Sequence, residues 1–101
     1  MFNKNTNRYI TRTIKYTIHP EIQKILWDLI DEQRKEYSEL DYLQVFELRE
    51  NHGRQHIIHK QELPERELIS ITLLKHTEPI NETVWCMDHE EYQIMLLPSD
   101  Y

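Results

Sequence analysis

The chain has 101 residues, of which 39% are hydrophobic and 30% are charged, and its formal net charge at pH 7 is −6. This length fits a single domain, and the apolar fraction is that of a folded globular protein. No apolar run approaches the roughly 20 residues of a membrane-spanning helix, residues 1–8 lack the apolar stretch of a signal peptide, and Cys86 is the only cysteine. We therefore expect residues 1–101 to form one acidic cytoplasmic domain without disulfide bonds.

The chain up to residue 38 is predicted to contain one strand and one long helix. Residues 8–18 are rich in threonine, isoleucine and tyrosine, which favour strands, and we expect a strand over residues 8–13. Pro20 suits the first turn of a helix that ends near Tyr37 or Ser38. Apolar residues within it recur at the spacing of one helical face, and they are Ile22, Ile25, Leu26, Leu29 and Ile30.

A β-hairpin is predicted after the helix. Residues 41–50 and 54–62 read as two strands, and they flank the segment 51–53, which ends in the only glycine. Glycine adopts without strain the left-handed conformation that the last residue of a three-residue loop requires. The pairs that such a loop implies across the hairpin are Phe46 with Ile58 and Val45 with His59.

Three further strands are predicted at residues 68–75, 82–88 and 91–97, the last two joined by a turn around His89 and Glu90. The expected element order is β-α-β-β-β-β-β. One amphipathic helix packed on a mostly antiparallel sheet is an α+β fold, and we predict this class for the chain.

Catalytic motifs are missing from the sequence. A single glycine excludes a glycine-rich phosphate loop, and none of the three serines lies in a nucleophile motif. Cys86 and His89 resemble a nucleophile and its base, but neighbouring Asp88, Glu90 and Glu91 would disfavour a thiolate. We therefore expect a protein that is not an enzyme.

The histidines do not match a metal site. His52, His56 and His59 are close in sequence, but residues three apart on a strand point to opposite faces, so His56 and His59 diverge. We expect no bound metal and no cofactor.

Polar side chains interrupt the predicted strands of the hairpin, and acids gather near the C-terminus. A polar side chain on a core face is costly unless it is hydrogen-bonded, so the hairpin residues either find partners inside the fold or line a binding surface. We predict a protein–protein interaction module, and its candidate surface residues are Gln44, Glu47, His59, Gln61, Glu62, Glu90 and Glu91.

Two alternatives remain open. Residues 1–16 carry four basic side chains and no acid, and Arg8, Tyr9 and Arg12 would suit the stacking and phosphate contacts of a single-stranded nucleic-acid site. A net charge of −6 opposes such binding on average. The acidic surface would alternatively mimic DNA and block a DNA-binding enzyme.

Several segments resemble the bacterial domain of unknown function 960 family. They are RYITRTI (8–14), LWDLIDE (26–32), DYLQVFEL (41–48), HKQELP (59–64), EPI (78–80) and MLLPSDY (95–101). The resemblance implies a small protein of Gram-positive bacteria, in some cases carried on a mobile genetic element, with no assigned biochemical role. It therefore transfers no catalytic residue, and it makes accessory roles in DNA replication or in inhibition of a host defence protein plausible.

Overall fold

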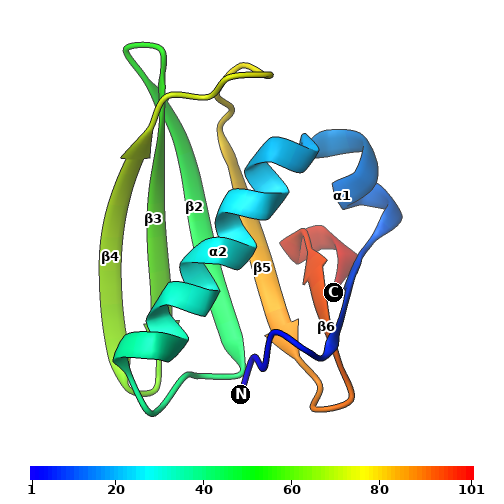
Figure 1. Ribbon diagram of the computed structural model, residues 1–101. Helices are drawn as coiled ribbons and strands as arrows, with labels where there is room; N and C mark the ends of the chain where they lie inside the picture. Colours follow the sequence, from blue (N-terminus) through cyan, green and yellow to red (C-terminus); the bar gives the residue numbers. More distant parts are fainter.

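The computed structural model describes residues 1–101 as one six-stranded sheet with a long helix lying across one face (Figure 1). The elements in chain order are β1 (Asn7–Ile10), α1 (Arg12–Thr17), α2 (Pro20–Glu36), β2 (Leu43–Asn51), β3 (Arg54–Glu62), β4 (Glu65–Thr72), β5 (Glu82–Asp88), β6 (Tyr92–Leu96) and a 3₁₀ turn (Pro98–Asp100). The strand order across the sheet is β1-β6-β5-β2-β3-β4. All neighbours pair antiparallel except β1 and β6, which are parallel. The α+β class is as expected, and neither α helix has the length and apolarity to cross a bilayer.

The first predicted strand is shorter than expected, and a helix follows it. Strand β1 ends at Ile10, and residues 12–17 form α1, which the predicted element order lacks. The hydroxyl of Thr11 accepts a hydrogen bond from the Ile14 N–H, so it caps the helix. Ile14 and Ile18 are both buried at a spacing of four, which serves a helical turn as well as it serves an alternating strand.

Helix α2 begins at Pro20, as the sequence predicts, and ends one residue before Tyr37. The ring Nδ1 of His19 accepts a 3.0 Å hydrogen bond from the Glu21 N–H and so caps the first turn. Ile22, Leu26 and Ile30 are buried against the sheet. The neighbouring Ile25 and Leu29 are only partly buried.

The hairpin loop has two residues rather than the predicted three. His52 and Gly53 both adopt left-handed backbone angles, with φ of 53° and 77°, which is the pattern of a two-residue turn. Asn51 therefore pairs with Arg54, and the register differs by one residue from the predicted one. Phe46 lies opposite His59 on the α2 side, and Val45 lies opposite Lys60 on the other side.

The core lies between α2 and the sheet. Buried side chains alternate along each strand, so that every second residue of β2 and β3 faces the helix. Helix α1 and the N-terminal segment contribute to the same side. The 13 residues of the core cluster are Phe2, Ile14, Ile18, Ile22, Leu26, Ile30, Phe46, Leu48, Ile57, Val84, Cys86, Met95 and Leu97.

Leu26→Ala should lower the free energy of unfolding by about 2–5 kcal/mol, because Leu26 is fully buried and its removal leaves a cavity between helix and sheet. Urea unfolding monitored by circular dichroism measures the change. Lys24→Ala, on the exposed side of the same helix, is the control and should change stability by less than about 1 kcal/mol. Equal effects of the two substitutions would show that this helix face does not carry the core contact.

Candidate functional site

The face of the sheet opposite α2 is not covered by a second layer of structure. Side chains at alternate strand positions project from it, and several are apolar. Ile69 is 66% exposed, Ile71 57% and Leu73 62%, all in or just after β4. The other apolar side chains on this face that keep some exposure are Tyr9, Leu43, Val45, Ile58, Trp85, Tyr92 and Ile94.

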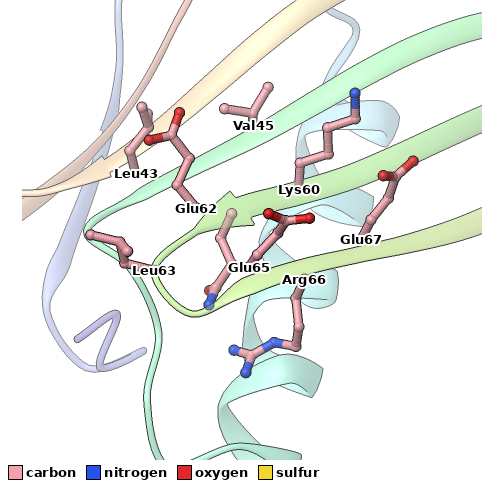
Figure 2. Close-up of a pocket in the computed structure, with 9 residues that line it drawn as sticks. Leu43, Val45, Lys60, Glu62, Leu63, Glu65, Arg66 and Glu67 are labelled. Atoms are coloured by element: carbon pink, nitrogen blue, oxygen red, sulfur yellow. The ribbon is translucent and has the colours of Figure 1, made fainter.

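A hollow of about 650 Å³ opens on this face at the end of the sheet where β3 turns into β4. Leu43 and Val45 of β2 form its floor, and Lys60 of β3 stands beside them (Figure 2). Three acidic side chains from β3 and β4 surround the floor, namely Glu62, Glu65 and Glu67. Figure 2 also shows Arg66 pointing to the opposite side of the strand, toward α2. We call this site the acid-rimmed hollow.

Lys60 offsets only part of the charge of the rim, because its hydrogen-bonded partner is another acid, Glu47. Its Nζ lies 2.9 Å from Glu47 Oε1, across the β2–β3 pair. The hydrogen bond with Glu47 raises the pKa of Lys60, and so does the charge of Glu47 together with that of Glu67. The side chains around the apolar floor are therefore more acidic than basic.

Three of the predicted surface residues are buried on the α2 side, where they bond to one another. His59 Nε2 lies 2.6 Å from Gln44 Oε1 and donates to it, because the amide oxygen can only accept. Gln44 Nε2 donates to Gln61 Oε1 at 3.0 Å, and Gln61 Nε2 donates to the Pro64 carbonyl at 2.6 Å. Of the two roles that the sequence left open for these side chains, they take the internal one.

Burial makes His59 a neutral side chain at pH 7. It lowers the pKa of His59 from 6.5 to about 4, and the positive charge of Arg66 acts in the same direction. The ring also stacks on Phe46, with 4.3 Å between ring centroids. Protonation of His59 would place an uncompensated charge in the core.

The remaining four predicted surface residues are accessible, at two places. Glu47 and Glu62 lie on the uncovered face beside the acid-rimmed hollow. Glu90 and Glu91 are exposed in the β5–β6 turn. This turn is at the same end of the sheet as the hollow, since Leu43 of the hollow pairs with Met87 just before the turn (Figure 1).

The residues of the nucleic-acid alternative do not share one surface. Arg8 Nη2 lies 2.6 Å from Asp31 Oδ1 of α2, and its guanidinium stacks over Trp27. Tyr9, the next residue of β1, points to the uncovered face and packs edge-on against Tyr92. Arg12 is exposed at the start of α1.

Cys86 is fully buried on the α2 side of β5. Burial raises the pKa of its thiol well above the ordinary value, while the charge of Arg8 opposes this shift. His89 stacks on Tyr92 in the exposed turn. Across the chain, no group of three or more His, Cys, Asp or Glu side chains is arranged to hold a metal ion.

The sequence predictions missed the floor of the hollow and the apolar stripe along β4. The missed residues are Leu43, Val45, Lys60, Glu65, Glu67, Ile69, Ile71 and Leu73. The sequence contained a signal for this stripe. Residues 65, 67, 69, 71 and 73 are every second residue of the segment, and every second residue of a strand lies on the same face. Which face is covered by the helix depends on the hairpin register.

Residues 7–100 match the family described as Staphylococcal protein of unknown function (DUF960). The chain belongs to this family. A crystal structure of a protein of unknown function from Enterococcus faecalis has the same fold, with a TM-score of 0.88 at 20% sequence identity, covering 99% of this chain and 94% of that one. No curated protein matches the chain. Family membership and the shared fold therefore leave the biochemical role to be argued from the surface of this family member.

Lowering the pH from 7 to 4 should destabilise the wild-type protein through His59. An unfolded histidine takes up a proton near pH 6.5, whereas folded His59 resists until about pH 4. The neutral state of buried His59 therefore costs no stability above pH 6.5. Between pH 6.5 and pH 4 the free energy of unfolding should fall by about 2–4 kcal/mol through this residue.

Urea unfolding at pH 7, 6, 5 and 4 measures the loss, and the difference between wild type and His59→Gln isolates it from the carboxylates. His59→Gln keeps a donor for Gln44 but cannot titrate, so its stability should fall less over this range. His52→Asn in the exposed turn is the control and should keep the wild-type dependence. Parallel curves for wild type and His59→Gln would contradict the assignment.

Proposed function

We propose that the protein is a non-enzymatic protein–protein interaction module that binds its partner on the uncovered face of the sheet. The observation that carries the proposal is the apolar floor of the acid-rimmed hollow at Leu43 and Val45, on a face where Trp85 and Ile94 also keep some exposure. An antiparallel sheet with one face in water usually shows polar side chains there. A contiguous exposed apolar surface instead marks a binding site.

The charge around the acid-rimmed hollow supports a basic partner. Glu62, Glu65 and Glu67 surround the hollow, and Lys60 is paired with Glu47. We infer that the partner presents a lysine or arginine next to an apolar side chain. The apolar group would lie on Leu43 and Val45, and the cation would meet the rim. Glu90 and Glu91, at the same end of the sheet, would add to the attraction at longer range.

The non-enzymatic part of the proposal is supported by where the reactive groups lie. Cys86 and His59 are buried, and His59 donates its ring N–H to Gln44. The hollow offers carboxylates and one paired ammonium group, without a nucleophile and base in contact. The family resemblance suggests where the partner would be found. It implies a bacterial cytoplasm and, in some cases, a mobile genetic element, so replication and host-defence proteins are candidate partners.

Reversing the charge of the rim should weaken partner binding. The double substitution Glu65→Lys and Glu67→Lys should lower affinity by at least about tenfold, chiefly through a slower association rate, because rim charges steer encounter. Val45→Asp should instead shorten the lifetime of the complex, since it removes an apolar contact at the floor. Surface plasmon resonance with the partner captured from the native host measures both rates.

A matched control carries the same change of charge on the other side of the molecule. Glu32→Lys and Glu36→Lys lie on the exposed side of α2 and should leave the affinity within about twofold of wild type. A captured protein whose affinity responds equally to both double substitutions binds by general electrostatics. That result would contradict a site at the acid-rimmed hollow.

A single-stranded DNA of about 20 nucleotides should not bind measurably at physiological salt, because the net charge is −6 and Arg8 is engaged with Asp31. Fluorescence anisotropy of a labelled strand measures this. Micromolar binding that is abolished by Arg12→Gln would replace the protein-partner proposal with the nucleic-acid one. Displacement of DNA from a host enzyme by the wild type, lost on reversal of the rim, would instead support the DNA mimic.

A further inference from the structure

Strand β4 is an edge of the sheet whose outward main-chain groups have no partner. Antiparallel strands alternate the direction of their main-chain groups, and the Glu50 N–H points toward Asn81 on the β5 side of β2. Odd-numbered residues of β2 therefore bond even-numbered residues of β3. Odd-numbered residues of β3 in turn bond even-numbered residues of β4, so the main-chain groups of Glu67, Ile69 and Ile71 point away from the sheet. These residues present a row of free donors and acceptors.

The β4 edge lacks most of the features that keep edge strands from pairing. It is eight residues long, contains no proline or lysine, and pairs with β3 without a bulge from Glu65 to Thr72. Its two glutamates, Glu65 and Glu67, both lie in its first half, so their charge opposes pairing only there. The uncharged stretch 68–74 is LISITLL, and exposed segments of this composition readily add a strand. The opposite edge, β1, has only four residues.

We infer that two copies of the chain pair through β4, antiparallel about a two-fold axis at Ser70. In this register Ile69 lies opposite Ile71 of the second copy, and the reverse pair repeats it. The four side chains then form an apolar cluster on the uncovered face. The free main-chain groups of Ile69 and Ile71 bond to one another across the axis.

Charge disfavours registers centred nearer the start of β4. Centring the pair at Glu67 would oppose two glutamates, which is unfavourable. Centring it at Leu68 would place Glu67 opposite Ile69. About Ser70, Glu67 faces Leu73 of the second copy and the two acidic ends lie far apart. The surface is thus complementary to itself, as a two-fold interface requires.

The pairing joins two six-stranded sheets into one continuous sheet. A two-fold axis across an antiparallel pair is perpendicular to the sheet, so both α2 helices lie on one face and both uncovered faces on the other. In the dimer the rim residue Glu67 lies beside the second copy, whereas Leu43, Val45 and Glu62 of the hollow lie on β2 and β3, away from the axis. The inference therefore does not depend on the proposed function, and it would stand if no partner bound there.

Sedimentation velocity over a range of protein concentrations tests the pairing. The wild type should pass from a 12.5 kDa monomer to a dimer as concentration rises. Ile69→Lys and Ile71→Glu, taken singly, should each weaken dimerisation by at least about tenfold, because each places two charges against isoleucines at the axis.

The double variant Ile69→Lys with Ile71→Glu should recover dimerisation, because each new lysine then lies opposite a new glutamate. It also has the net charge of the wild type. Tyr9→Lys, on the opposite edge of the same face, is the control and should dimerise like the wild type. Circular dichroism should show all four variants folded, since the three positions are exposed.

Three results would overturn the inference. The first is a wild type that stays monomeric at every concentration, which would leave the edge to a strand of another protein. The second is a dimer that both single variants leave intact, which would place the interface elsewhere. The third is a double variant that stays monomeric, which would exclude the register about Ser70.

Discussion

One helix of 17 residues is too small to cover a six-stranded sheet. The helix is about 25 Å long and 10 Å wide, whereas six strands span nearly 30 Å across the sheet. Helix α1, Phe2 and the N-terminal segment fill the rest of the covered face. No helix lies on the other face, so most of its apolar side chains and the β4 edge keep some exposure, although Met87 and Leu96 are buried there.

Polar residues are buried beneath α2. Toward its C-terminal end the helix buries Gln33 rather than an apolar residue, and the sheet below it carries Gln44, His59 and Gln61. Their hydrogen bonds reach the Asp41 and Pro64 carbonyls. The network thus ties two turns to the sheet, at the end where the hollow opens on the opposite face. A satisfied network of this kind fixes the geometry of the turns that frame the hollow.

The sequence predicted the elements more successfully than it predicted which face each side chain occupies. Helix α2 and strand β3 follow from local periodicity and from Pro20 and Gly53. The spacing of Ile14 and Ile18 fits a strand or a helical turn, and the structure has the helical turn, capped by Thr11. The hairpin register depends on the backbone angle of His52, which composition does not reveal. The two-residue turn at His52 and Gly53 places Phe46 and His59 together on the buried face.

The uncovered face and the β4 edge are both exposed because the helices cover only one side of the sheet, but they would bind partners through different groups. The face offers side chains, apolar at Leu43 and Val45 and acidic around them, so it selects a partner by charge and shape. The edge offers main-chain groups, which pair with any strand, so its selectivity must come from the side chains beside it. In the pairing about Ser70 those side chains are isoleucines. Ile58 of β3 lies directly opposite Ile69 and would extend the apolar cluster across both copies. Self-pairing would therefore bury the part of the face that lacks charge and leave the acidic part to a basic partner.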